Sequence, residues 1–426
     1  MTDRIATGRL GAAVRWADER DFHHHLLVAA ILGVAVGVVA TAFRVTWLFL
    51  KHHLWSALPQ LYWRIVVSTA AGLLIGAILY RTFYPGALAA LVRQFHREGR
   101  VPFEENVPVV PVGLAGLIAG QNAGPEGVMS VVGGSFGSKL AELFAFEDSR
   151  KLLTLAGMGA GFGAILGAPI GGALLWLELP HERGLEYYEA IVPTFVASFA
   201  GYLTEVLLGG MALFPAWRAS TLVPVEPWQL AAAVGVGAVC VPFGFVYTRT
   251  FAFVGRLFNR WSPAVYVRTT VAGLGIGLLG YLLPLTYFYG GSKMNVLLSE
   301  TFSPTVLLLT LAGTMVAAAL TIHGNWLGGL IIPHMFMGAL VGQAASLVVP
   351  RLPPTFGMLA GMAAFNSVVT ATPLSSALIA IALTDGASIT PVFLASLAAF
   401  VGSPGLQFLE EAAPRSESPN FHVGDD

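Results

Sequence analysis

Apolar stretches of membrane-spanning length recur along this chain, and they constrain its fold more than any other feature. A helix needs roughly 20 apolar residues to cross the hydrocarbon core of a bilayer. Within that core every backbone N–H and C=O must be paired, which only helices and closed barrels achieve. A barrel would show short segments of alternating polarity instead. The chain is therefore predicted to be an all-α polytopic membrane protein, with clear spans at residues 26–43, 65–80, 152–179, 230–246, 271–283 and 306–322.

The scarcity of charge agrees with this prediction. Only 11% of the 426 residues are charged, whereas soluble domains carry roughly 25%, so most of the surface is expected to face lipid. The net charge of −1 argues against nucleic acid as a partner. Cys240 is the only cysteine, so no intramolecular disulfide is expected, and we expect neither a metal site nor a cofactor.

Basic residues indicate the orientation, because cytoplasmic loops of membrane proteins carry an excess of Lys and Arg. Four arginines lie in the first 22 residues, and Arg93, Arg97 and Arg100 follow the second apolar stretch. Two crossings separate the clusters, so both can face the cytoplasm. We expect a multi-pass protein of the cell (inner) membrane with both termini cytoplasmic, as an N-terminal segment over residues 1–25 and a tail over residues 409–426.

The chain also resembles itself. Three pairs of residues lie 204 positions apart: Gly124 and Gly328, Gly134 and Gly338, Pro169 and Pro373. A repeat of this size predicts a transmembrane domain over residues 26–408 with two related halves, roughly 26–225 and 226–408. Such halves are often inverted, and their broken helices then meet near the midplane of the membrane around the substrate.

Glu126 is the most informative single residue. It lies in Gly124-Pro125-Glu126-Gly127, at membrane depth, where a carboxylate is costly and by default marks an ion or proton pathway. Gly and Pro interrupt helices, and a helix that begins here leaves its first N–H groups unpaired, which favours anions. The repeat places apolar Leu330 opposite Glu126, so the fold itself does not demand a carboxylate. The alternative is a glutamate that caps a helix start and faces water.

The second broken segment begins at Gly328 and Gly329. The four residues that follow offer no polar side-chain atom: Leu330, Ile331, Ile332 and Pro333. An ion bound here would therefore be held by backbone N–H groups, which select an anion over a cation.

These segments resemble a known family. Residues 124–134 resemble the Gly-Arg-Glu-Gly-Pro filter segment of the CLC chloride channels and chloride/proton antiporters, and residues 328–333 resemble their second filter segment, Gly-x-Phe-x-Pro. Residues 167–178 are similar to the family's Asn-Ala-Pro-Leu-Ala-Gly helix, which ends in acidic residues. Residues 372–385 are similar to its later Ala-Pro-Leu segment. Order and spacing agree over roughly residues 80–410.

The resemblance implies an inverted-repeat CLC-like helical bundle with broken helices meeting at the midplane. It implies a homodimer in the lipid bilayer, with a pore for chloride or another small anion in each subunit and with bound chloride ions. Protons are a second candidate substrate. Glu126 would be the gating glutamate. The implied anion-binding residues are Gly124, Pro125, Gly127, Val128, Gly329, Leu330, Ile331, Ile332 and Pro333.

Several positions depart from the family pattern. The family's first filter segment contains a serine, whereas the corresponding stretch here holds Tyr84, Pro85 and Gly86. The family's central tyrosine is also absent, and Gln407 stands close to its place. Both hydroxyls that would close the inner side of the central anion site are therefore missing.

The proton-carrying positions differ as well. Glu178 matches the first of the antiporters' two adjacent internal glutamates, and Leu179 replaces the second. Glu178 and His334 remain candidates to carry protons or line the filter. For His334 the alternative is a packed histidine with satisfied hydrogen bonds.

These departures favour a glutamate-gated chloride channel of the voltage-gated chloride channel family. The alternative is a chloride/proton antiporter, and a proton-coupled secondary transporter of another substrate is a third reading. The family's fluoride-selective members carry an Asn-rich first filter, which this chain lacks. An enzyme is not expected: residues 133–137 fit the Gly-x-Ser-x-Gly hydrolase pattern, but they lie in a membrane helix and not in the strand–turn–helix setting that this pattern needs.

Overall fold

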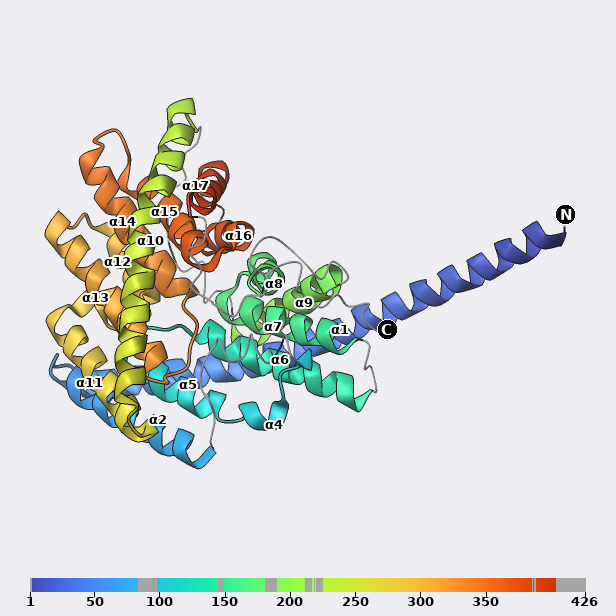
Figure 1. Ribbon diagram of the computed structural model, residues 1–426, viewed down its shortest axis with the longest axis horizontal. Coiled ribbons are helices and arrows are strands. Elements are labelled where there is room, and N and C mark those ends of the chain that lie inside the picture. Colours follow the sequence, from blue (N-terminus) through green and yellow to red (C-terminus); the bar gives the residue numbers. More distant parts are fainter. Residues whose placement is uncertain are drawn as a thin grey trace.

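The computed structural model describes residues 2–82, 95, 98–144, 149–180, 190–210, 217, 219, 225–384, 386 and 388–403, with side chains from residue 23 onward. Helices account for most of these residues, and no strand occurs among them (Figure 1). The predicted all-α fold is therefore confirmed.

The chain up to residue 210 forms the helices α1 (Thr2–Ala57), α2 (Trp63–Thr82), α4 (Phe103–Asn106), α5 (Val109–Ile118), α6 (Pro125–Leu143), α7 (Arg150–Leu166), α8 (Pro169–Glu178) and α9 (Ile191–Gly209). The remainder forms α10 (Pro227–Trp261), α11 (Val265–Leu282), the 3-10 turn η2 (Pro284–Thr286), α12 (Gly291–Ser299), α13 (Pro304–His323), α14 (Ile331–Val348), α15 (Pro354–Thr370), α16 (Pro373–Leu383) and α17 (Ile389–Val401).

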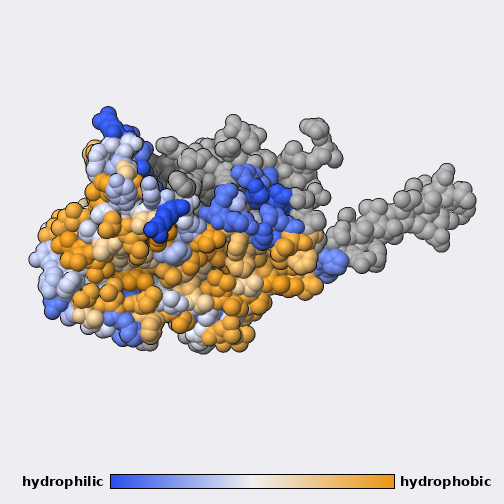
Figure 2. All heavy atoms as spheres, turned by 90° about the horizontal axis from the view of Figure 1, so that it is seen from below, coloured by the Kyte–Doolittle hydropathy of each residue, from blue (hydrophilic) through white to orange (hydrophobic). Residues whose placement is uncertain are grey.

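Seven helices of the described part are long and apolar enough to cross a membrane. They are α2, α9, α10, α11, α13, α14 and the part of α1 from His23 to Ala57. Figure 2 shows that apolar residues cover most of the described surface on one face of the molecule. Lipid is the solvent that such a surface requires, because a soluble protein rarely exposes so large an apolar area.

One predicted span is wrong. The apolar stretch 152–179 was expected to be continuous, but it forms two helices, α7 and α8. Gly167 ends α7 with a positive φ of 68°, a left-handed conformation that glycine adopts at no steric cost. Pro169 then occupies the first position of α8, where its missing N–H is not needed. The stretch therefore forms helices of 17 and 10 residues, both shorter than the roughly 20 residues of a typical span.

The two halves of the chain repeat one packing scheme. In the first half α7 packs on α6, α8 and α9, and α1 packs on α9; in the second half α15 packs on α14, α16 and α17, and α10 packs on α17. Figure 1 shows α6 to α9 and α14 to α17 as two neighbouring groups. Across the halves, α2 packs on α11 and α8 on α16. The predicted repeat is thus present in three dimensions.

Paired glycines make the same close contact in each half. A side chain on Gly133 of α6 would collide with the backbone carbonyl of Gly157 on α7, and the reverse also holds. Gly338 of α14 and Gly361 of α15 block each other in the same way. Small residues let the backbones of membrane helices approach closely, which increases the dispersion attraction between the helices.

This contact can be tested with a single methyl group. Gly338→Ala is expected to lower the free energy of unfolding by about 1–3 kcal/mol through overpacking, and thermal unfolding in detergent measures the loss. Gly235→Ala on α10 is the matched control, because a methyl group there meets no atom within 4 Å. Equal stability of the two variants would contradict the close packing.

Candidate anion-binding site

The site is built where α6 and α14 begin. Gly124 N–H donates to Gly329 O at 2.7 Å, and Gly329 N–H donates to Gly124 O at 2.9 Å. This reciprocal antiparallel pair joins equivalent points of the two halves. The 204-residue offset predicts Gly328 opposite Gly124, so the expected register is wrong by one residue at this point, although Pro169 and Pro373 begin α8 and α16 at the predicted offset. The counterpart of Glu126 therefore shifts from Leu330 toward Ile331, which is also apolar.

Two amide side chains fix the backbone before this pair. Gln121 Nε2 donates to Ala123 O at 3.0 Å and to Leu327 O at 2.9 Å. Asn122 Nδ2 donates to Thr286 O at 3.1 Å and to Phe288 O at 2.9 Å. Two carbonyls of the non-helical backbone that precedes α6 and α14, those of Ala123 and Leu327, are thus paired within the protein, as membrane depth requires.

Glu126 is the second residue of α6 and its side chain reaches the other half. The residue is 1% exposed. Its Oε1 accepts a long hydrogen bond of 3.5 Å from the amide of Ile332 in the first turn of α14, and its Oε2 has no partner among the described residues. The carboxylate therefore lies at the positive end of the α14 dipole, where an anion is stabilised.

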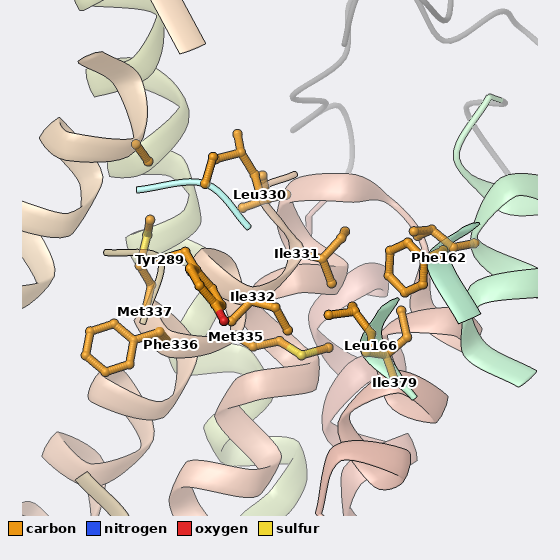
Figure 3. Close-up of a cluster of buried hydrophobic side chains, with 14 of the residues drawn as sticks. Phe162, Leu166, Tyr289, Leu330, Ile331, Ile332, Met335, Phe336, Met337 and Ile379 are labelled. Carbon is orange, nitrogen blue, oxygen red and sulfur yellow. The ribbon is translucent and has the colours of Figure 1, made fainter. Parts of the chain in front are cut away.

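A pocket adjoins Glu126. Its polar lining residues are Glu126, Ser130, His334 and Thr370, and the others are Gly127, Phe162, Leu175, Trp176, Leu179, Gly329, Leu330 and Ile331. Figure 3 shows the adjoining apolar cluster, in which Leu330, Ile331 and Ile332 lie between Tyr289 and Phe162 in this view. The pocket is thus largely apolar, with few groups able to bind a charge.

The predicted anion-binding residues divide into two groups. Gly127, Gly329, Leu330 and Ile331 line the pocket together with Glu126. The others are buried in the same helix starts without lining it: Gly124, Pro125, Val128, Ile332 and Pro333. Of the remaining candidates, Tyr84, Pro85, Gly86 and Gln407 lie outside the described residues.

Glu178 does not line the pocket, although its neighbour Leu179 does. Its carboxylate accepts hydrogen bonds from Ser375 N at 2.8 Å, Ser375 Oγ at 2.6 Å and Leu374 N at 3.1 Å. These amides belong to the first turn of α16, so Glu178 caps a broken helix of the other half. Sequence alone gave no sign of this contact, because its partners lie nearly 200 positions away.

His334 lines the pocket but both of its ring nitrogens are engaged. Nδ1 lies 3.2 Å from Asn366 Oδ1, and Nε2 lies 3.1 Å from the Tyr247 hydroxyl. Asn366 Nδ2 donates to Ser376 Oγ at 2.7 Å, so its oxygen faces the histidine and the proton is assigned to Nδ1. This is the geometry of a packed histidine with satisfied hydrogen bonds.

Among the pocket residues whose side chains can form hydrogen bonds, three were missed by the sequence analysis: Ser130, Trp176 and Thr370. Ser130 lies four positions after Glu126 and hence on the same helix face, a spacing that could have identified it. Trp176 and Thr370 come from α8 and α15, and no local pattern connects them with Glu126. Trp176 Nε1 donates to Ser130 Oγ at 3.1 Å.

A group of cations lies near Glu126 on another side. Lys51 Nζ is 3.9 Å from the ring centroid of Phe288, and it is close enough to Lys293 for the two charges to repel. Burial lowers the pKa of Lys293, and the charge of Arg64 adds to the effect. None of the ion pairs between described residues includes these three cations.

Aromatic rings connect these cations with the site. The Lys51 ammonium faces the ring of Trp47 at 5.7 Å, and the ring centroids of Trp47 and Tyr289 are 5.8 Å apart. Tyr289 in turn lies close enough to Glu126 for the two groups to interact electrostatically. The rings of Trp47 and Tyr289 therefore lie between the Lys51 ammonium and the buried Glu126 carboxylate.

Known structures share this fold. A CLC-type fluoride/proton antiporter superposes with a TM-score of 0.80 at 21% identity, covering 92% of this chain and 98% of the other. A slow cyanobacterial Cl⁻/H⁺ antiporter superposes with a TM-score of 0.77 at 20% identity, covering 89% and 94%. At this identity the likeness establishes the architecture alone.

Sequence relatives carry transport names. An H(+)/Cl(−) exchange transporter ClcA of Klebsiella pneumoniae is 25% identical over 420 residues, which are 92% of this chain and 88% of that protein. A chloride/fluoride channel protein of Pseudomonas syringae pv. tomato is 26% identical over 345 residues, covering 78% and 74%. Residues 88–403, most of the chain, match the voltage gated chloride channel family. The chain therefore belongs to the voltage gated chloride channel (CLC) family of membrane proteins that transport anions.

Proposed function

We propose that this protein conducts chloride through a pathway that Glu126 gates in each subunit. The observation that carries the proposal is the position of the Glu126 carboxylate on the Ile332 amide, where α14 begins. The same helix end would stabilise a dehydrated anion. Carboxylate and chloride therefore compete for one position, and chloride passes when the carboxylate is protonated or moves aside.

We propose a channel and not an exchanger, because Glu126 is the only carboxylate among the residues that line the described pocket. Coupled exchange needs a second group that passes protons onward from Glu126. Glu178 is held by three donors of α16, and Leu179 lines the pocket where the family pattern has a glutamate. The names of the Klebsiella relatives favour chloride/proton exchange, which stays the second candidate.

The remaining expectations complete the proposal. We propose a homodimer in the cell (inner) membrane, with both termini cytoplasmic and with a two-repeat transmembrane domain over residues 26–408. The family match over residues 88–403 supports the domain, and the basic residues near the N-terminus support the orientation. Bound chloride is cargo, and we propose no resident cofactor or metal.

Substituting Glu126 separates channel from exchanger. In liposomes, wild-type chloride efflux is expected to rise as pH falls, because a protonated carboxylate no longer competes with chloride, and no protons should move against it. Glu126→Gln is expected to conduct at all pH values. Chloride and proton fluxes are recorded together, with exposed Glu300→Gln as control. Stoichiometric proton uptake driven by chloride, and lost in Glu126→Gln, would overturn the channel proposal.

Glu178 is predicted to stabilise the fold and not to carry protons. Glu178→Ala should lower the free energy of unfolding by about 1–3 kcal/mol, because the donors of α16 lose their acceptor in a buried place. Glu178→Gln keeps one acceptor oxygen and should lose less. Thermal unfolding and chloride flux are measured on both variants. Lost transport in a Glu178→Gln protein of unchanged stability would assign the carboxylate to transport.

The group of cations is predicted to raise the local anion concentration. Lys293→Gln should slow chloride flux by roughly two- to tenfold at low ionic strength, and the difference should shrink in high salt, which screens exposed charges. Liposome flux at two salt concentrations at constant chloride measures this. Arg260→Gln, which removes an exposed cation in the last turn of α10, is the control. Equal flux for both variants at low salt would contradict the prediction.

A further inference from the structure

Ser130 is a buried hydroxyl that the repeated fold does not explain. It lies on α6 one turn after Glu126, is 0% exposed, and lines the pocket. A hydroxyl carries one proton to donate and two lone pairs to accept with. A buried serine that leaves its proton without an acceptor costs free energy, so its surroundings should reveal a partner.

The Ser130 oxygen is already an acceptor. Trp176 Nε1 donates to it at 3.1 Å, and an indole N–H can only donate. The Ser130 O–H must therefore point elsewhere. Several buried hydroxyls of this protein donate to the carbonyl four residues back, as Thr41 does to Gly37 and Ser346 does to Gly342. Ser130 makes no such bond, and no described residue accepts its proton.

The direction that is left is the pocket. The lining of that pocket includes Phe162, Leu175 and Leu179, whose side chains offer no acceptor. We infer that the Ser130 hydroxyl, held by Trp176, donates a hydrogen bond to the transported anion inside this pocket. The inference rests on the proposed function and deepens it, because it supplies a side-chain donor in a chain whose first filter segment has no serine.

The same geometry limits which anions are carried. An anion in this pocket exchanges its water for the Ser130 hydroxyl, the helix end beside Glu126 and mostly apolar walls, because the Thr370 hydroxyl that also lines the pocket donates to Asn366 O at 2.7 Å. Fluoride is strongly hydrated, and the hydration free energy that it gives up exceeds what these groups supply. Chloride and nitrate give up less hydration free energy. The substrate class is therefore a weakly hydrated monovalent anion. The hydrogen bond that Ser130 Oγ accepts from Trp176 also makes the Ser130 hydroxyl a stronger donor.

Calorimetric titration with chloride and with nitrate tests the role of Ser130. All variants are made in full-length Glu126→Gln protein, so that the carboxylate does not compete. Ser130→Ala should weaken chloride binding about tenfold, the lower end for a hydrogen bond to a charged group, and nitrate binding less. Ser135→Ala is the matched control, because Ser135 lies on the same helix, is buried, has no hydrogen-bond partner among the described residues and does not line the pocket. It should stay within about twofold of the parent.

Each other outcome overturns the inference. Chloride affinity of Ser130→Ala within about twofold of the parent, or an equal loss in Ser135→Ala, makes Ser130 a packing residue. A parent protein that binds no chloride removes the pocket as an anion site, whatever flux the wild type shows, so this failure is distinct from a failure of chloride transport. If Ser130→Ala does not fold, Trp176→Phe is used, which removes the donor to Ser130 and should still weaken chloride binding about threefold; unchanged binding there counts against the inference.

Discussion

Two backbone hydrogen bonds between Gly124 and Gly329 determine the geometry of everything around them. These bonds place the starts of α6 and α14 side by side. The N-termini of the two helices, which carry the positive ends of their dipoles, therefore converge in an apolar interior. Glycine is required at both positions, because a side chain on either would occupy the space of the Glu126 carboxyl group. A further close approach of Gly127 to the backbone of Gly328 brings the helix starts within reach of one another.

The two repeats share a fold but not a charge pattern. Both buried carboxylates discussed above lie in the first half and meet helix starts of the second: Glu126 reaches α14, and Glu178 reaches α16. The two contacts differ in strength. The Glu178 carboxylate accepts three hydrogen bonds of 2.6 to 3.1 Å. The Glu126 carboxylate accepts one hydrogen bond of 3.5 Å, and its other oxygen has no partner among the described residues. The firmly held carboxylate suits a structural cap, and the loosely held one suits a group that exchanges with an anion.

The sequence predicted what depends on length and periodicity. Apolar stretches and the Gly and Pro positions were enough for the helical class, the repeat and the importance of Glu126. The break at Gly167 was missed because the flanking residues stay apolar throughout. The register was wrong by one residue because Gly328 and Gly329 are chemically equivalent in a one-dimensional comparison.

Tertiary contacts were beyond such reasoning. The capping of α16 by Glu178 and the indole of Trp176 on Ser130 each join helices that lie far apart in the chain. No local propensity encodes them, since they arise from how α8 packs on α16 and from the side-chain contact of α8 with α6. The candidate site was therefore predicted as a pair of helix starts, and its hydroxyl and indole became visible only in the folded chain.

The pairing of Gly124 with Gly329 also bears on how fast the proposed gate can work. A pathway that opened by rocking one half against the other would have to break both hydrogen bonds in surroundings without water, where an unpaired amide costs several kcal/mol. Collective motions of that kind take microseconds to milliseconds. With the helix starts locked together, the cheaper movement is rotation of the Glu126 side chain alone. The hydrogen bonds between Gly124 and Gly329 thus leave rotation about the few side-chain torsion angles of Glu126 as the movement that sets the rate of gating.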